Sequence, residues 1–466
     1  MRRLSFVVVC ISTLAVGCQH IPAAPLDLSA SVQDLRGRDV NIEPVKAFAE
    51  KLSATAPTPV VFDPADGLSL PEAEAVALWY NPELRVARIE AEGAAAVAQT
   101  SGAWADPELG FETGEKEVEG GAPGFLHDAG SSVDRSWINL ASLSITIPLS
   151  GRPGAERKLR QSEQDVALLR VAEEEWQTLQ SLRNAWLAWS VASLRLHLLD
   201  SHIAALAEFA HVAESLSEAG ELDPSGARLF SIEHGRSVAA RERLVRDVDS
   251  QRLGLLATLG LLPDAPATLL PATSIESGST TADPTTHPAV QRLAAEYKVA
   301  EAALRLELRK QYPDLTLSPT YADEQDETAL TLGVGLPIPA WNANRQGIAA
   351  AVAQRNAARA RVESALQQAL ATLAQADARL AGADAQRKIL EEQVAPMADQ
   401  QLEQARALLA VGEMDVAPMY EALRQTHAIK EELLESQLEA MQARVTRNAL
   451  LQPAPFSTNN DGEVTP

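Results

Sequence analysis

The chain has 466 residues and a formal net charge of −23, and only 4% of its residues are aromatic. The acidic balance argues against a nucleic-acid partner, because phosphate binding requires a basic surface. This length would allow two or three globular domains, but abundant alanine and long intervals between helix breakers favour long packed helices over several compact cores.

The N-terminus has the features of a targeting signal. Two arginines precede an apolar run at 4–16 that is too short to cross a bilayer, and a glycine and Cys18 follow. This order predicts a cleaved signal peptide over residues 1–17. The sequence before Cys18 resembles a bacterial lipobox, with its leucine one place earlier than usual, so we expect Cys18 to carry lipid, including palmitate. An ordinary signal peptide with an incidental cysteine is the alternative. Cys10 lies in the discarded segment, which leaves the mature chain without a disulfide or a cysteine metal site.

The first half of the mature chain is predicted to begin with an unstructured stretch. Residues 18–67 are proline-rich and lack sustained periodicity, so we expect a lipid-anchored, extended segment. A helix is predicted to start at Leu70-Pro71-Glu72, with Ser69 as a plausible N-cap, and to continue to about Gly102. Two strands follow at about 106–117 and 136–148, on either side of a glycine-rich loop.

A very long helix is predicted next. Nothing breaks the helical pattern over about 153–219, and apolar residues recur there at heptad-compatible steps. At 1.5 Å per residue, its length would be on the order of 100 Å. A turn at Gly220 leads to a returning helix that ends near Gly260. The first structural unit is therefore expected over 68–262, and a linker rich in proline, serine and threonine follows at 263–286.

The second half of the chain repeats this organisation over residues 287–451. Its predicted elements are a helix from Pro288, strands at about 313–323 and 328–339, a long helix over about 344–411 that Pro396 kinks locally, and a returning helix to about 450. The tail at 452–466 is polar, and we expect it to be disordered.

Three pairs of matching motifs support a duplication. They are Asn-Pro-Glu-Leu at 81–84 with His-Pro-Ala-Val at 287–290, Asp-Pro-Glu-Leu at 106–109 with Tyr-Pro-Asp-Leu at 312–315, and Gly-Glu-Leu-Asp at 220–223 with Gly-Glu-Met-Asp at 412–415. The predicted fold is therefore mainly α, built from two helix–strand–strand–helix units.

The four predicted strands alternate apolar and polar residues. In the last strand, Leu330, Leu332 and Val334 fall on one face. Alternation over about ten residues is the weak signature of an outer-membrane strand, and a half-buried hairpin of a soluble sheet fits it equally well. Trp104, just before the first strand, and Trp341, just after the last, would form an interfacial girdle at one membrane face.

Four strands are too few for a closed barrel in one chain. A bilayer tolerates no open sheet edge, and single-chain barrels need about eight strands or more. If the strands span a membrane, protomers must share them, and three protomers would supply twelve. Glu108, Glu112 and Asp314 would then face the barrel lumen, more as ordinary lumen polarity than as a binding site.

From about residue 68 to 450 the chain resembles the TolC-type outer-membrane efflux family. The shared features are the two units, the start at 81–84, the Ala-Asp-Pro exit at 105–107 and the two Gly-Glu-x-Asp turns. The run Gly-Leu-Pro-Ile-Pro-Ala-Trp-Asn-Ala-Asn-Arg-Gln-Gly at 335–347 is the most specific, and it resembles the heavy-metal efflux branch. The resemblance implies a homotrimer with a 12-stranded barrel in the outer membrane and a long α-helical barrel across the periplasm. It also implies docking onto a periplasmic adaptor (membrane fusion) protein and an inner-membrane, proton-driven pump of the RND type.

The resemblance further implies that the two hairpin turns lie at a periplasmic aperture. In the family, acidic residues shortly after the second turn narrow this aperture and are approached by the adaptor. Aligned on Gly412, Glu421 occupies one such position and Pro418 the other, so a two-ring acidic gate is in question. Other carboxylates near the turns at Gly220 and Gly412 are Glu221, Asp223, Glu413 and Asp415. A threefold ring of carboxylates favours cations in a pore; solvated carboxylates at helix ends are the alternative interpretation.

Neither a catalytic nor a metal-binding motif is recognisable in the sequence. The eight histidines are scattered, and the five methionines form no cluster that would hold copper(I). We therefore expect no enzyme activity, cofactor or resident metal, but a passive outer-membrane channel for efflux of heavy-metal cations. Drug or other small-molecule efflux is the close alternative. A periplasmic adaptor lipoprotein or a coiled-coil scaffold without a pore are others; two hairpins with little other β-structure argue against an adaptor.

Overall fold

The computed structural model of the chain describes residues 21–55, 61–119, 133–275, 283–324, 327–410 and 416–451. Two helix–strand–strand–helix units follow one another in these ranges. The first part of the chain forms α2 (Leu28–Arg36), α3 (Glu43–Thr55), α4 (Leu70–Tyr80), α5 (Pro82–Thr100), β1 (Glu108–Glu119), β2 (Val133–Ile147), α6 (Arg152–Glu218) and α7 (Pro224–Thr258). The second forms the short η1 (Pro284–Thr286), α8 (Pro288–Arg309), β3 (Leu315–Glu324), β4 (Glu327–Gly335), α9 (Arg345–Ile389), the π turn η2 (Leu390–Val394), α10 (Ala395–Ala410) and α11 (Val416–Leu451).

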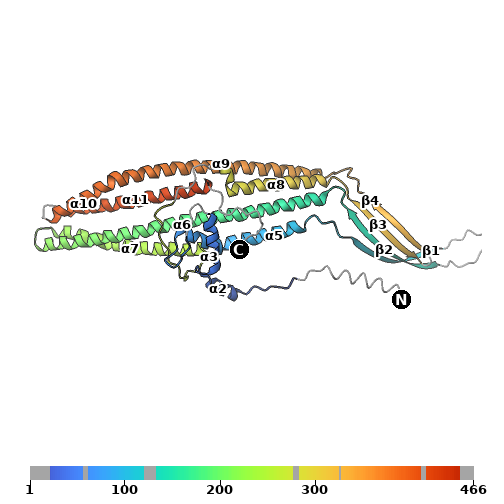
Figure 1. The fold of residues 1–466 in the computed structure, drawn as a ribbon, viewed down its shortest axis with the longest axis horizontal. Helices are drawn as coiled ribbons and strands as arrows, with labels where there is room; N and C mark the ends of the chain where they lie inside the picture. Colours follow the sequence, from blue (N-terminus) through green and yellow to red (C-terminus); the bar gives the residue numbers. More distant parts are fainter. Residues whose placement is uncertain are drawn as a thin grey trace, which may run out of the picture.

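The molecule is elongated, with its strands at one end of the long axis and the far ends of the helical hairpins at the other (Figure 1). Helices α5, α6, α8 and α9 pack side by side in the same order as strands β1 to β4. The sheet and the helical layer therefore form one continuous arc. Among the described helices, we find none that is both long and apolar enough to cross a membrane.

The stretch predicted as one helix from Leu70 to about Gly102 is two helices, α4 and α5. The break lies at Asn81, whose ψ of 125° is not helical. Pro82 explains the break, because a proline ring disfavours the α conformation of the preceding residue. Asn81 instead caps α5, with its side chain accepting hydrogen bonds from the backbone N–H groups of Glu83 at 2.9 Å and Leu84 at 3.1 Å.

The prediction that residues 18–67 are extended is wrong for the described part of that segment, which contains α2 and α3. Asp27 caps α2 by accepting a hydrogen bond from the N–H of Ser29 at 2.8 Å. In α3, Val45 is fully buried and Phe48 packs against Trp79 with ring centroids 5.4 Å apart. Both helices are short, and isolated helices of this length are marginal, so contact with the body of the protein is needed to stabilise α3.

The strands form one antiparallel sheet in the order β1-β2-β3-β4. Three of its strands lie close to the predicted ranges, but β4 ends at Gly335, four residues earlier than expected. The residues predicted as strand but lying beyond β4 include Pro337 and Pro339, and proline has no N–H to donate to a sheet. A local kink is predicted at Pro396. The structure has a π turn, η2, just before this proline, and it ends at Val394.

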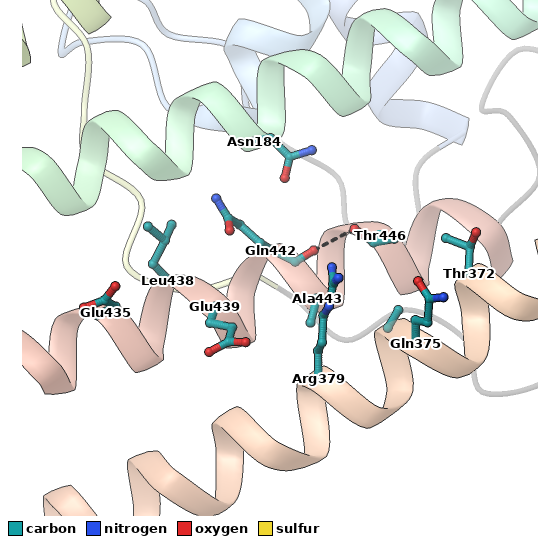
Figure 2. Close-up of a pocket in the computed structure, with 11 residues that line it drawn as sticks. Asn184, Thr372, Gln375, Arg379, Glu435, Leu438, Glu439, Gln442, Ala443 and Thr446 are labelled. Carbon is teal, nitrogen blue, oxygen red and sulfur yellow. Dashed lines mark hydrogen bonds between the residues drawn. The ribbon is translucent and has the colours of Figure 1, made fainter.

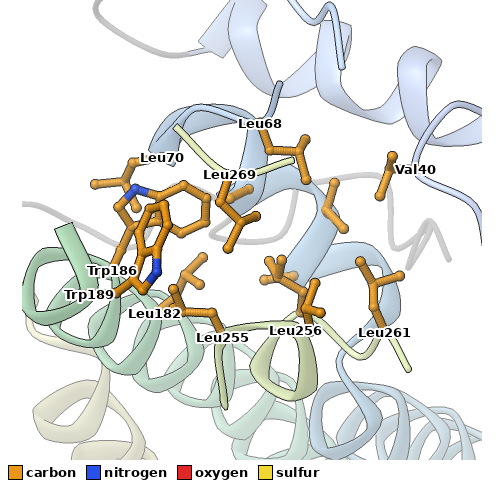
Figure 3. Packing of buried hydrophobic residues seen from close by; sticks show 14 of the residues in the cluster. Val40, Leu68, Leu70, Leu182, Trp186, Trp189, Leu255, Leu256, Leu261 and Leu269 are labelled. Atoms are coloured by element: carbon orange, nitrogen blue, oxygen red, sulfur yellow. The ribbon is translucent and has the colours of Figure 1, made fainter. Parts of the chain in front are cut away.

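A hydrophobic core joins the two ends of the first unit (Figure 3). Leu182, Trp186 and Leu255 are fully buried there, from α6 and α7. The segment predicted as a linker packs on the same core. The Trp186 indole N–H donates to the carbonyl oxygen of Leu270 at 3.1 Å, and Leu269 forms a β-bridge with Leu68. The residues after α7 are thereby fixed against the helices.

Candidate functional site

One face of the sheet is apolar and exposed. The strand register aligns a complete row of four residues on it: Phe111, Ala141, Tyr321 and Leu330. In β4, Leu330 is 80% exposed and Leu332 is 66% exposed. Soluble monomers rarely expose apolar patches of this extent, and such patches mark interaction or membrane surfaces.

The opposite face of the sheet is polar. The adjacent row consists of Gly110, Ser142, Thr320 and Thr331. Glu108 and Glu112, predicted to face a lumen, are exposed on this face, with Glu108 paired to Ser144. Asp314 lies just before β3 instead, and its carboxylate forms an ion pair with Arg152 at 2.9 Å. Among the described residues, the outer edges of β1 and β4 have no partner strand.

Exposed aromatic residues lie where the strands meet the helices. Trp104 is 61% exposed and Trp341 is 92% exposed, and both belong to the short connections at this junction. Tyr312, between α8 and β3, is 60% exposed; it belongs to a repeated motif of the sequence but was not predicted as an interface residue. Gly102 lets the first turn of α6 approach the connection between α5 and β1 closely. A Cβ at residue 102 would lie only 2.5 Å from the carbonyl oxygen of Pro153.

The turn between α6 and α7 lies at the far end of the molecule. Gly220 has a φ of +76°, which a side chain would disfavour, and the Glu221 N–H closes the turn on the carbonyl oxygen of Leu216 at 2.9 Å. Glu221 is exposed. Asp223 caps α7, and hydrogen bonds from Ser225 lower the pKa of its carboxyl group. Both carboxylates are thus exposed at the tip of the hairpin.

The second hairpin turn, with Gly412, Glu413 and Asp415, lies outside the described residues, as does Cys18. Glu421 is described, in the second turn of α11. Arg424 donates two hydrogen bonds to its carboxylate at 2.7 and 2.9 Å, and Gln425 donates a third at 2.8 Å. The Arg424 contact is the main cause that lowers the pKa of Glu421 to about 2. Glu421 is therefore ionised, but its charge is balanced by a cation on the same helix.

Both hairpins meet near the tip in a second hydrophobic cluster. Phe209 of α6, Phe230 of α7, Leu402 of α10 and Met419 of α11 belong to it, and Phe230 and Met419 are fully buried. The Tyr420 ring packs edge-on against Phe230, with centroids 6.1 Å apart. Because this cluster contains residues from all four helices, the two hairpins are joined by apolar contact at their ends.

Two histidines stack on each other in the same region. His202 of α6 and His427 of α11 have ring centroids 4.2 Å apart and ring planes only 16° apart. Both Nδ1 atoms are buried and lack a hydrogen-bond partner among the described residues. Burial, and then His427, lower the pKa of His202 to about 4, and burial also lowers the pKa of His427. The sequence gives no signal for this pair, because its members are far apart in the chain.

We expect this histidine pair to lower the free energy of unfolding as the pH falls from 7 to 5. Each histidine has a folded pKa below its ordinary value of 6.5, so the unfolded chain binds protons first and unfolding is favoured. Glu233 and Glu431 face the pair and oppose this effect, whereas Lys430 reinforces it. Between pH 7 and 5, the fall in Tm should be smaller, by on the order of a few degrees, in the double variant His202→Phe/His427→Phe, which keeps a stack without titration. Equal falls in both proteins would contradict this role.

A polar groove lies between α9 and α11, with Asn184 of α6 facing it (Figure 2). Its volume is about 520 Å³, and its charged residues are Arg379, Glu435 and Glu439. The charges are mixed in sign and exposed. The described residues contain no group of three or more histidine, cysteine or acidic side chains positioned to hold a metal ion.

Comparisons with known proteins agree with this architecture. A model of the outer membrane efflux protein family matches residues 285–451. The chain is 26% identical over 293 residues to the nickel-cobalt-cadmium resistance protein NccC of Alcaligenes xylosoxydans xylosoxydans, an alignment that covers 61% of this chain and 63% of NccC. The match therefore spans less than two thirds of that relative.

Solved structures share the fold over most of the chain. The outer-membrane channel OprN aligns with a TM-score of 0.71 at 17% identity, covering 94% of this chain and 98% of OprN. The outer membrane protein VceC from Vibrio cholerae aligns with a TM-score of 0.65 at 17% identity, covering 82% of this chain and 95% of VceC. At such identities the likeness concerns the fold, which is mainly α with a four-stranded sheet.

Proposed function

We propose that the chain is the outer-membrane channel of a tripartite efflux system, since a model of the outer membrane efflux protein family matches its residues 285–451. In this proposal three copies each contribute four strands to one 12-stranded barrel. The observation that carries it is the sheet itself: an exposed apolar face, an opposite polar face and two unpaired outer edges. A bilayer tolerates no open edge, so neighbouring copies must pair β1 with β4.

The same arrangement supports a continuous duct. Since α5, α6, α8 and α9 continue the order of the strands, closing the sheets into a barrel also closes the helices into a tube. The tube would cross the periplasm and dock at its hairpin ends with a periplasmic adaptor and an inner-membrane pump of the RND type. The chain itself performs no chemistry, and the pump supplies the energy. A lipid on Cys18 would anchor each copy in the membrane. The test is incorporation of labelled palmitate, which is expected in wild type but not in the Cys18→Ala variant.

We infer that the exported substrates are heavy-metal cations. The similarity to NccC, whose name records nickel, cobalt and cadmium resistance, supports this inference together with the run at 335–347. The test is deletion of the gene in its own host, followed by measurement of growth inhibition by nickel, cobalt, cadmium and a panel of antibiotics. Sensitivity to the metals alone is the expected result. Sensitivity to antibiotics alone would refute the substrate but keep the channel, and no change in either would refute both.

The charge balance at Glu421 gives a prediction for ion selectivity. Arg424→Gln should leave an unbalanced ring of three carboxylates and raise the preference for cations over anions about two- to fivefold. Glu421→Gln should change the preference in the opposite direction, and the double variant should resemble wild type. Reversal potentials in planar bilayers measure these ratios. If all four channels have the same selectivity, these residues lie away from the conducting path.

A further inference from the structure

A cavity of about 630 Å³ lies between the first turns of α6 and the last turns of α8. Its size is within the roughly 300–1,000 Å³ that is usual for small-ligand sites. Lys158 of α6 and Arg305 and Arg309 of α8 contribute its charged side chains. Its ten lining residues, all in the described part of the chain, include no aspartate or glutamate. The cavity thus gathers positive charge in a protein whose net charge is −23.

Two nearby carboxylates, those of Glu307 and Asp314, have partners outside the cavity lining. Glu307 accepts hydrogen bonds from Asn344 at 2.6 Å and from Lys310 at 2.5 Å, and Asp314 pairs with Arg152 at 2.9 Å. Glu301 reaches Arg305 only at 4.0 Å. Two of the three cations of the cavity, Lys158 and Arg309, therefore have no ion-pair partner among the described residues.

The position of the cavity relates it to the membrane boundary. Its lining ends at Tyr312, three residues before β3, and α6 begins five residues after β2 ends. Trp104 and Trp341 lie in the connections at the same junction. The cavity also lies between the two central helices of the arc, α6 and α8, and not at the α5 or α9 edges that neighbouring copies would cover.

The remaining lining combines apolar and backbone groups. Leu308 is 40% exposed and Tyr312 is 60% exposed, so apolar surface lies beside the three cations. The carboxyl end of α8 does not repel an anion strongly, because the N–H groups of Lys310, Gln311 and Tyr312 bond to its last carbonyl oxygens. An ammonium, two guanidinium groups and adjacent apolar side chains match a phosphate ester that carries acyl chains.

We propose that this cavity binds the phosphate of an anionic phospholipid headgroup in the leaflet that faces the helices, an inference that rests on the proposed outer-membrane location. One such site in each protomer would fix the depth of the barrel in the bilayer. Inorganic phosphate would meet the same cations, so the test must separate the lipid from the free ion.

The experiment uses the substitution Gly154→Glu, with Gly154→Gln as its matched control. Gly154 lines the cavity, and a Cβ added there meets nothing within 4 Å, so both side chains fit and both favour the helix. Native mass spectrometry of the full-length protein counts bound lipid in micelles that contain phosphatidylglycerol or phosphatidylcholine. Inorganic phosphate is titrated separately. The triple variant Lys158→Gln/Arg305→Gln/Arg309→Gln is compared with Arg228→Gln/Arg243→Gln/Arg246→Gln, which removes three exposed charges from α7.

We expect Gly154→Glu and the cavity triple variant to bind phosphatidylglycerol about 10- to 100-fold more weakly, since each basic residue near an anionic lipid contributes roughly fivefold in affinity. Gly154→Gln and the α7 variant should bind it as wild type does, and phosphatidylcholine should bind weakly throughout. Equal phosphatidylglycerol binding by Gly154→Glu and Gly154→Gln would overturn the site, and saturation by inorganic phosphate without lipid preference would overturn the lipid assignment. Fractionation of the same cells tests location separately: wild type outside the outer membrane would refute the proposed function.

Discussion

Replacing Leu332 with arginine is expected to remove most of the protein from the outer membrane. Leu332 lies near the middle of β4 on the apolar face, opposite Pro319 of β3, and is 66% exposed. An arginine on the lipid-facing side of a barrel strand costs roughly 2–4 kcal/mol at the bilayer midplane. Because a trimer would carry three such residues, we expect at least a tenfold loss of assembled trimer, measured by membrane fractionation and semi-native electrophoresis.

The neighbouring position provides the control. Thr331 is next to Leu332 in the same strand and is opposite Thr320 on the polar face. Thr331→Arg adds the same side chain, but on the face that would line water, so the trimer should assemble at nearly the wild-type level. The pair therefore tests the orientation of the sheet and not only its tolerance of charge. Equal assembly of both variants, or selective loss of Thr331→Arg, would contradict a lipid-facing apolar surface.

The sheet and the duplicated architecture were predictable because both depend on periodic patterns. Alternation fixes which residues share a strand face, and the register then aligns these faces across four strands. The ends of the elements were less certain where one residue overrides a pattern. Pro82 separates α4 from α5 within a stretch that was predicted as one helix. Similarly, the apolar residues at 336 and 338 continue the alternation of β4 after its hydrogen bonding has ended.

The candidate sites were less predictable because they depend on contacts between distant elements. His202 and His427 meet only because α6 packs against α11, and the phosphate cavity requires α6 and α8 to be neighbours. Arg424 is three residues after Glu421, a spacing at which side chains on a helix can form an ion pair. The sequence alone does not determine which of several nearby polar side chains binds the Glu421 carboxylate. Side-chain partners of this kind follow from packing, which local patterns do not specify.

A buried ion pair gives the second large prediction. Arg88 of α5 contacts Glu175 of α6 at 3.2 Å, and their side chains are only 10% and 7% exposed. The second oxygen of Glu175 has no hydrogen-bond partner among the described residues. Burial raises the pKa of Glu175 to about 7 even though Arg88 lowers it. Leu84 and Val171 of the surrounding apolar cluster explain this environment.

Arg88→Met should therefore destabilise the protein by about 3–5 kcal/mol, because it leaves a buried carboxylate without its cation. The double variant Arg88→Met/Glu175→Leu should recover most of this loss, since a well-packed apolar pair avoids the desolvation of both charges. Denaturant unfolding of the purified proteins measures both effects. The single variant should be less destabilised at pH 5 than at pH 8: a raised folded pKa favours the native state at low pH, and this contribution is lost as the pH rises through the folded pKa. If the double variant is as unstable as the single one, the cost comes from lost packing of the arginine stem and not from the unpaired charge.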